Sequence, residues 1–191
     1  MGYHTDFTGE FKVIDLKTGE LEPLAPEQVA YLQRFNDTRR MGRDATLTAK
    51  RRDPLRDAVN LDVGDEGAYF VGSRGFAGQE QFSGDDDELE CDEDGNPIKD
   101  VIDFNRPPKD QPGLWCQWRP SDDGEFIVWD EGEKFYDYVE WLKYLLKHFL
   151  VPWGYGLKGM VEWQGEELED IGRIFVEGQE VSTKRGRITW D

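Results

Sequence analysis

Residues 132–150 read GEKFYDYVEWLKYLLKHFL and hold the strongest secondary-structure pattern in this sequence. Large apolar side chains recur there at spacings of three and four residues, which places them on one face of an α-helix. Pro152 and Gly154 follow and indicate where the helix ends. The segment therefore predicts a long amphipathic helix whose apolar face packs against the rest of the protein. The apolar positions are Phe135, Tyr138, Val139, Leu142, Leu145, Leu146 and Phe149.

The sequence after this helix follows the two-residue alternation of β-strands. In residues 157–164, the apolar Val161 and Trp163 alternate with polar neighbours. Residues 171–176 and 181–190 are two further strands in this pattern, and a glycine between them suits a tight hairpin turn. We expect an antiparallel C-terminal meander packed by the long helix. The predicted fold class is α+β, with a single domain over residues 1–191.

Shorter elements precede the helix. Residues 3–15 are expected to form a strand or one arm of a hairpin. Pro26 and Pro54 each predict the start of a helix, because proline is tolerated in a first turn. Residues 114–119 and 126–129 predict two strands joined by a hairpin loop.

The composition describes an acidic chain: 34% of its 191 residues are charged and the formal net charge is −18. Charged side chains are expected at the surface or in loops. Attraction to phosphate supplies most of the affinity for nucleic acid, so this charge argues against direct binding to nucleic acid or to an anionic membrane. It permits the opposite relation, a protein partner with a basic surface.

The sequence also bears on location. It shows no signal-peptide pattern and no segment apolar enough to span a membrane. Its two cysteines, Cys91 and Cys116, lack the spacing of a metal site or of a disulfide framework. We therefore expect a reducing compartment, the cytoplasm.

The charges are unevenly distributed. Residues 34–52 carry a net charge of +5, whereas residues 85–103 carry −9. A run of like charges repels itself and cannot bury a core, so we expect residues 85–103 to form an acidic, mobile surface loop. Its acidic members are Asp85, Asp86, Asp87, Glu88, Glu90, Asp92, Glu93, Asp94, Asp100 and Asp103.

No candidate catalytic residue, metal site or cofactor site emerges from these patterns. The acidic run fits an EF-hand loop only until the twelfth position, where Val101 stands in place of the required glutamate. The two histidines, His4 and His148, are too few for a usual zinc site. A buried strand predicted over residues 68–71 leads into the glycine-rich segment Gly72–Gly78, which lacks the ending of a phosphate-binding loop.

Tryptophans cluster around the predicted hairpin at residues 114–130. Neighbouring residues of a strand point to opposite faces, so one or two of these indoles could be exposed and mark a binding surface. The candidates are Trp115, Trp118 and Trp129. A helix packed over an aromatic sheet face explains the same residues without any binding role.

Several segments are similar to a known group of proteins: MGYHTDFTGEF, NRPPKDQPGLWCQW, GEKFYDYVEWLKYLLKHFL and PWGYGLKGMVEWQGEELEDIGRI. Together they resemble an uncharacterised family of small proteins encoded by tailed bacteriophages and by bacterial genomes, often in prophages. The resemblance covers most of the chain except the acidic residues 85–103. It implies a setting in the bacterial host cell and carries no site residues.

The sequence leads to two hypotheses of function. The first is a non-enzymatic phage or prophage accessory protein that binds a host or defence protein. Its contact is either an acidic surface that mimics DNA, centred on Asp85, Asp86, Asp87, Asp92 and Asp94, or the aromatic patch. The second is a small enzyme or binding module for a nucleotide or nucleic acid, which would use Gly72, Arg74, Gly75 and Gly78.

Overall fold

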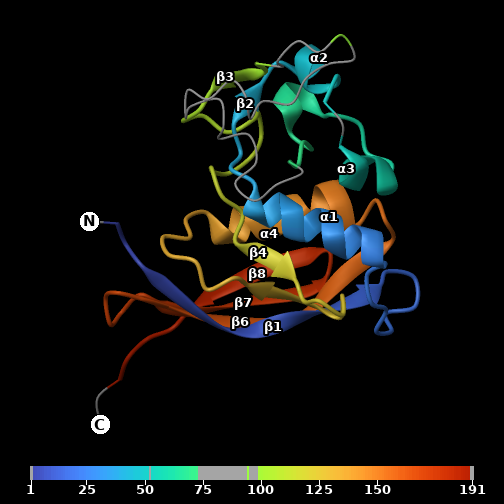
Figure 1. Ribbon diagram of the computed structural model, residues 1–191. Helices are drawn as coiled ribbons and strands as arrows, with labels where there is room; N and C mark the ends of the chain where they lie inside the picture. Colours follow the sequence, from blue (N-terminus) through green and yellow to red (C-terminus); the bar gives the residue numbers. More distant parts are fainter. Residues whose placement is uncertain (1, 52, 73–93, 95–98, 190–191) are drawn as a thin grey trace. The chain divides into compact units, whose positions relative to one another are not determined.

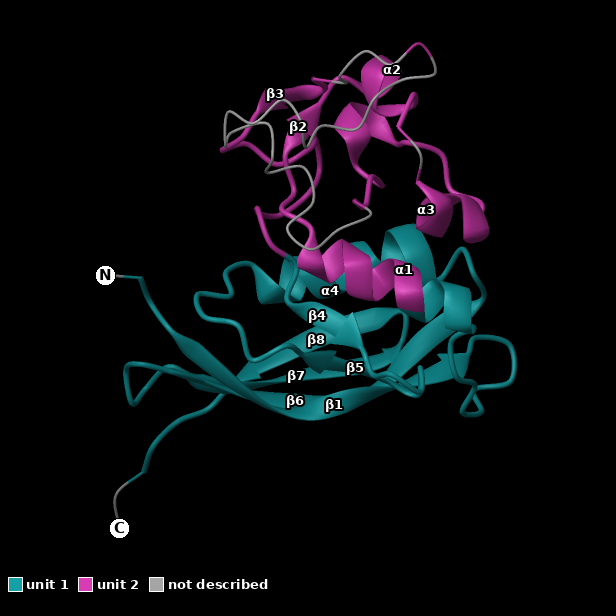
Figure 2. Ribbon diagram, viewed as in Figure 1, with its two compact units in different colours: residues 1–29, 116–191 teal, residues 30–115 magenta. Residues whose placement is uncertain are grey.

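The computed structural model describes residues 2–51, 53–72, 94 and 99–189 (Figure 1). Contacts group the chain into two compact units: unit 1 comprises residues 1–29 and 116–191, and unit 2 comprises residues 30–115 (Figure 2). The boundary falls inside helix α1 (Pro26–Asp37), which begins at the proline that predicts it. The expected α+β class is confirmed. The prediction that residues 1–191 form a single domain remains a prediction, alongside this division into two units.

In the described residues of unit 1, six strands form one antiparallel sheet in the order β4-β5-β1-β6-β7-β8. The N-terminal strand β1 lies inside the sheet, paired with β5 on one side and along its whole length with β6 on the other (Figure 2). Strands β6, β7 and β8 are the predicted meander, which is confirmed. The bounds are β1 (Thr5–Asp15), β4 (Trp118–Pro120), β5 (Phe126–Trp129), β6 (Tyr155–Gly165), β7 (Ile171–Gly178) and β8 (Glu180–Arg185).

The long helix of unit 1 contacts β4 and β8 through its first part and β6 through its second. It consists of α4 (Tyr138–Leu145) and a π-helical continuation, η4 (Leu146–Leu150). Apolar burial drives this packing, because each large side chain removed from water contributes roughly 1.5–3 kcal/mol. The buried side chains of unit 1 include Phe7, Phe11, Val13, Trp118, Ile127, Leu142, Leu145, Phe149, Leu157, Val161, Trp163 and Ile174.

The predicted start of this helix at residue 132 is wrong, since α4 begins at Tyr138. The backbone before it contains three non-glycine residues with positive φ: Glu131 (63°), Lys134 (61°) and Asp137 (54°). A left-handed residue interrupts a right-handed helix, so the chain reaches helical geometry only after Asp137. Phe135 is nonetheless buried, which explains why the apolar pattern extends beyond the helix.

Two glycines allow β1 and β6 to approach closely near their middles. Gly9 has φ +113° and Gly159 has φ +149°, values that side-chain-bearing residues rarely adopt. A Cβ atom at Gly9 would lie 2.7 Å from the carbonyl oxygen of Met160, and one at Gly159 would lie 2.7 Å from that of Glu10. Each strand therefore requires glycine where it meets the backbone of the other.

Unit 2 is built from short elements. Asp44 accepts hydrogen bonds from the backbone of Thr46 and Leu47 and so caps α2, while Asp53 caps α3, the helix predicted at Pro54. Besides the second part of α1, the elements are β2 (Gly42–Arg43), α2 (Ala45–Thr48), α3 (Pro54–Ala58), η1 (Asp65–Gly67) and β3 (Val101–Asp103), with β2 and β3 paired antiparallel.

The strand predicted over residues 68–71 is wrong, although Ala68, Phe70 and Val71 are buried as expected. The N–H groups of residues 68–70 bond to backbone carbonyls of the preceding turn, and the carbonyl oxygens of these residues accept from side chains. Arg40 donates to the carbonyl oxygens of Ala68 and Phe70, and Tyr31 donates to that of Tyr69. Among the described helices, none combines the length and apolar character needed to cross a bilayer.

Candidate functional site

The acidic residues proposed for partner binding fall mostly outside the described residues. This holds for Asp85, Asp86, Asp87 and Asp92, whereas Asp94 is described and exposed. The end of the acidic segment departs from the expected surface loop: residues 101–103 form β3, and Asp100 is 1% exposed. Asp100 is buried because arginines surround it.

Of the three candidate tryptophans, Trp118 is buried, whereas Trp115 and Trp129 are partly exposed. Trp118 is 1% exposed; its Nε1 donates to the carbonyl oxygen of Tyr138 at 2.7 Å, and its ring meets Phe7 edge to face. Trp129 is partly buried against Phe7 and donates through Nε1 to Gln117 at 3.1 Å. Trp115 is partly buried and belongs to unit 2. Trp118 therefore serves the core of unit 1 and offers no surface to a partner.

The glycine-rich segment is described only at its start. Gly72 is buried, and Arg74, Gly75 and Gly78 lie outside the described residues. In the described part of the chain, no three histidine, cysteine, aspartate or glutamate side chains are placed to hold a metal ion. The histidines make separate contacts, His4 with Asp6 at 3.0 Å and His148 stacked on Tyr144.

A groove of about 670 Å³ lies over β6, β7 and β8 in unit 1. Its charged side chains engage one another: Arg173 donates to Glu162 at 2.7 Å, and the Lys184 ammonium lies 5.5 Å from the ring centre of Phe175. All charged side chains of its described lining are exposed. We interpret it as the solvated outer face of the sheet.

The most unusual polar feature is a cluster of buried arginines in unit 2, which the sequence-based reasoning placed at the surface. Four arginines are at most 7% exposed, and all of them contact residues 68–71 or the carboxylates beside that segment. Buried charge is costly unless it is paired and hydrogen-bonded, so their placement requires specific partners. We define the arginine cluster as Arg40, Arg43, Arg51 and Arg56.

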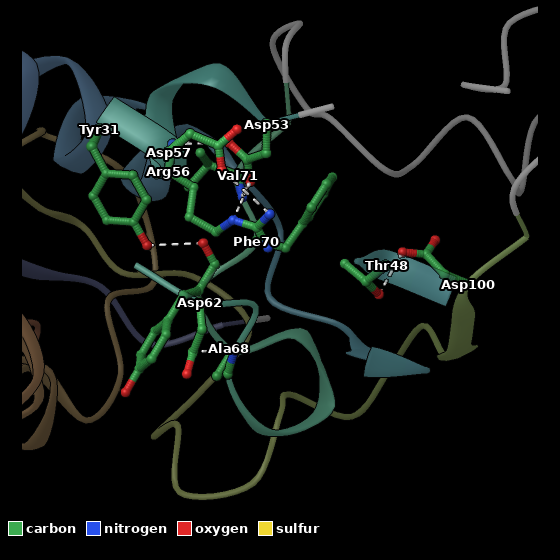
Figure 3. Close-up of polar contacts among 12 residues, drawn as sticks. Tyr31, Thr48, Asp53, Arg56, Asp57, Asp62, Ala68, Phe70, Val71 and Asp100 are labelled. Atoms are coloured by element: carbon green, nitrogen blue, oxygen red, sulfur yellow. Dashed lines mark hydrogen bonds and ion pairs between the residues drawn. The ribbon is translucent and has the colours of Figure 1, made fainter. Parts of the chain in front are cut away.

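Asp100 is the acceptor at the centre of this cluster. Its Oδ1 lies 2.9 Å from Arg43 Nη1 and 3.1 Å from Arg51 Nη2, and its Oδ2 accepts from Thr48 Oγ1 at 2.8 Å, the bond drawn in Figure 3. The side chain of Asp100 is 0% exposed. One carboxylate thus joins α2, β2 and the chain that leads into β3.

The remaining arginines use neutral acceptors, aromatic rings or a second carboxylate. Arg40 donates to Gln111 at 3.2 Å and stacks over Phe35, with its guanidinium carbon 4.1 Å from the ring centre. Arg43 stacks over Phe70 at 4.1 Å. Guanidinium groups are weakly hydrated and favour such stacking, which lowers the cost of burying them.

Arg56 and Asp53 form the second buried ion pair, with 3.7 Å between Arg56 Nε and Asp53 Oδ2 (Figure 3). Asp53 also accepts from the backbone N–H groups of Arg56 and Val71. The same carboxylate thereby caps α3 and fixes residue 71.

The charges of the cluster shift one another's pKa values. Desolvation alone would raise the pKa of Asp100, but Arg43, Arg51 and the bond from Thr48 outweigh it and hold this pKa below its usual value. Desolvation, followed by repulsion from Arg51 and Arg40, lowers the pKa of Arg43 to about 10 despite the attraction of Asp100. Desolvation raises the pKa of Asp53. Burial is therefore the main reason that the charged form of Arg43 is disfavoured.

The sequence contained a partial signal for this cluster. The basic stretch at residues 34–52 and the acidic one at residues 85–103 include both sides of the Arg43–Asp100 pair. Charge alone cannot show which members turn inward, because exposed Lys50 lies beside buried Arg51. The guanidinium groups of Arg43 and Arg51 lie over the ring of Phe70, and composition does not reveal that contact.

Comparison of the chain with models of protein families, with curated proteins and with solved structures found no match. The likeness to a bacteriophage family therefore stays an expectation from the sequence.

Proposed function

We propose that this chain is a non-enzymatic binding protein whose negative exterior engages a protein with a basic surface. The observation that supports the proposal is the distribution of charge between interior and exterior. Of the described residues, four arginines but only two aspartates are buried among the charged side chains. They leave a charge of −20 on the rest of the chain, against −18 for the whole.

An exterior of this kind repels nucleic acid and attracts surfaces that themselves bind nucleic acid. In the setting that the sequence resemblance implies, the partner is a host or defence protein in the bacterial cytoplasm, and the acidic surface occupies its basic groove in the manner of DNA. Electrostatic complementarity of this kind raises the association rate and selects basic partners. The aromatic alternative is weaker, because Trp118 is buried.

The test begins with capture of binding proteins from a bacterial lysate at 50 and 500 mM NaCl and their identification by mass. The dissociation constant of a purified complex is then measured across this range. Because screening shortens from about 14 to 4 Å, an electrostatic contact should weaken by at least about tenfold. An affinity that does not change with salt contradicts the proposal.

Two matched variants locate the contact. The first changes the acidic run at Asp85, Asp86, Asp87, Asp92 and Asp94 to asparagine. The second changes five exposed glutamates of unit 1 to glutamine: Glu10, Glu20, Glu22, Glu125 and Glu180. Both remove five charges. Loss of affinity in the first variant alone identifies the acidic run as the contact, whereas equal loss in both would show that only net charge matters.

A further inference from the structure

We propose that two copies of this chain associate through β8, which pairs antiparallel with β8 of the second copy across a two-fold axis at Ser182. This inference uses the sheet of unit 1 and does not depend on the proposed protein partner. Among the described strands, β8 lies at one edge of the sheet and pairs only with β7. The other edge, β4, is three residues long and ends in Pro120, which has no N–H group to donate. β8 is therefore the edge that can accept another strand.

The hydrogen bonds between β7 and β8 determine which backbone groups of β8 face outward. The N–H group of Gly186 donates to the carbonyl oxygen of Ile171 at 2.8 Å, so these two residues form a bonded pair. In an antiparallel ladder, bonded and non-bonded pairs alternate, and the register of β8 with β7 contains no shift. The backbone groups of Val181, Thr183 and Arg185 therefore point away from β7, and no described residue bonds to them.

These outward-facing groups restrict how a second β8 strand can add to the edge. Both members of each new bonded pair must be residues whose backbone faces outward. Pairing Val181 with Thr183 of the second copy satisfies this condition and places Ser182 opposite Ser182. The same register places Glu180 opposite Lys184 twice, once on each side of the axis. These are non-bonded pairs, in which the side chains of the two strands lie closest together.

Charge favours this register over its neighbours. When Thr183 faces Thr183, the register brings Lys184 opposite the neutral Ser182. When Thr183 faces Arg185, the two Lys184 side chains oppose each other. The proposed register instead pairs opposite charges directly across the strands, which stabilises a sheet. Charged side chains on an edge strand commonly prevent indiscriminate pairing, and here they admit one partner in one register.

The edge also differs in charge from the rest of the chain. Residues 180–187 contain three basic side chains and one acidic side chain, a net charge of +2 in a chain of −18. All four of these side chains are exposed. A locally basic edge reduces the repulsion that two acidic chains experience when they approach each other. The charge of β8 therefore suits a second copy of this chain as its partner.

The direct test is sedimentation equilibrium of the full chain at about 150 mM NaCl, where screening over about 8 Å limits the repulsion between two acidic chains. Pairing of six-residue strands gives a small interface, so we expect a weak dimer with a dissociation constant of roughly 10–100 μM. A chain that stays monomeric well above this concentration overturns the proposal.

Charge reversal tests the pairs between Glu180 and Lys184. Glu180→Lys and Lys184→Glu each place like charges opposite each other at two positions, and each should weaken the dimer by at least about tenfold. A mixture of the two variants brings opposite charges together again, as does the double variant, so both should associate as the unchanged chain does. Glu10→Lys is the matched control, because it makes the same charge change at an exposed position of the central strand β1.

The mixture keeps the test independent of folding defects, because a misfolded variant would not recover when it is mixed with another. Single variants that associate as well as the unchanged chain would show that another surface forms the dimer. Failure of the mixture to associate would exclude the proposed pairs.

Disulfide formation tests the axis itself. In a Cys91→Ser background, Ser182→Cys places two thiols opposite each other at a Cα separation of about 4.5 Å, which suits a disulfide. Oxidation with copper phenanthroline should crosslink this variant much faster than Thr183→Cys, whose cysteine faces Val181 of the second copy. The remaining native cysteine, Cys116, is buried. Equal crosslinking of the two variants would overturn the register.

A measurement on the unchanged chain needs no substitution. Hydrogen exchange at the amides of Val181 and Thr183 should slow as protein concentration rises through the dissociation constant, because these groups become bonded in the dimer. The amide of Lys184 is the internal control, since its backbone faces β7 in the single chain. Exchange at Val181 and Thr183 that does not depend on concentration would contradict pairing through β8.

Discussion

Among the described residues of unit 2, Asp100 contacts more of the buried arginines through its carboxylate than any other acidic residue does. Its two carboxylate oxygens serve Arg43, Arg51 and Thr48 within 3.1 Å. The Asp100 side chain is 0% exposed, so these contacts are shielded from solvent. Removing one member of a buried ion pair leaves the other charge uncompensated, which costs more than the pair itself contributes.

We therefore expect Asp100→Asn to lower the free energy of unfolding at pH 7 by about 3–5 kcal/mol, measured by urea denaturation. Asp65→Asn is the control, since Asp65 is an exposed aspartate of the same unit. Surface changes of this kind usually stay within about 0.5 kcal/mol. Equal stabilities for the two variants would show that Asp100 does not hold the cluster together.

Acid should abolish this difference, and the sign follows from the pKa of Asp100. Because the folded protein holds this pKa below its ordinary value, the stabilisation is present above the unfolded pKa, about 4. It is lost as pH falls further, through the folded pKa. The pKa of Asp53 is raised, but this residue contributes to both proteins, so their difference isolates Asp100. Urea unfolding curves of the unchanged protein and of Asp100→Asn between pH 7 and pH 3 measure this difference in stability.

Sequence reasoning is least successful at this scale. It places charged residues outside, and for most of this chain that holds, yet Arg43 and Asp100 are buried. Burial of an arginine depends on a distant aromatic ring and a distant carboxylate, here Phe70 and Asp100, which lie 27 and 57 residues from Arg43. The composition around Arg43 does not show that these two distant residues will contact it.

At the scale of elements, apolar periodicity predicts much more. The alternation in residues 157–164 finds β6, and the three- and four-residue spacing finds α4 with η4. The boundary at Tyr138 is missed because Asp137 adopts positive φ, which a pattern of apolar residues does not record. The prediction of a strand over residues 68–71 fails because these residues are buried as expected, but their backbone bonds within a turn and to side chains.

The close approach of β1 and β6 leads to a prediction about Gly159. Gly159→Ala places a Cβ atom about 2.7 Å from the carbonyl oxygen of Glu10, and it also requires alanine at φ +149°. The control is Gly19→Ala, where φ is +72° and no atom lies within 4 Å. Backbone strain alone should lower the free energy of unfolding of Gly19→Ala by about 1–2 kcal/mol.

The free energy of unfolding should fall by at least about 1 kcal/mol more in Gly159→Ala than in the control. The reason is that the two central strands must also separate. Chemical denaturation of both variants gives the comparison, and hydrogen exchange should show faster opening of β1 and β6 in Gly159→Ala only. Similar losses of unfolding free energy in the two variants would mean that β1 and β6 accommodate the added methyl group without further destabilisation.

At the scale of the whole molecule, net charge makes salt a stabilising agent. A formal charge of −18 on 191 residues repels itself in the folded state, and ions screen this repulsion. We expect the Tm to rise by roughly 2–4 °C between 50 and 500 mM NaCl, which corresponds to about 1 kcal/mol. A variant with Asp85, Asp86 and Asp87 changed to asparagine should show a smaller rise in Tm over the same salt range. A Tm that falls with salt would indicate that attractive ion pairs dominate the exterior instead.

The central position of β1 also determines when the fold can be completed on the ribosome. This strand emerges before β6, its partner along all eleven residues, which ends at Gly165, 150 residues after β1 ends at Asp15. At about 5–20 residues per second, synthesis of that interval takes roughly 8–30 s. Residues 30–115 leave the exit tunnel during this wait, so unit 2 can fold while the nascent N-terminus is still without its neighbour. Chaperones that hold extended apolar segments would have their longest opportunity at Phe7 and Phe11.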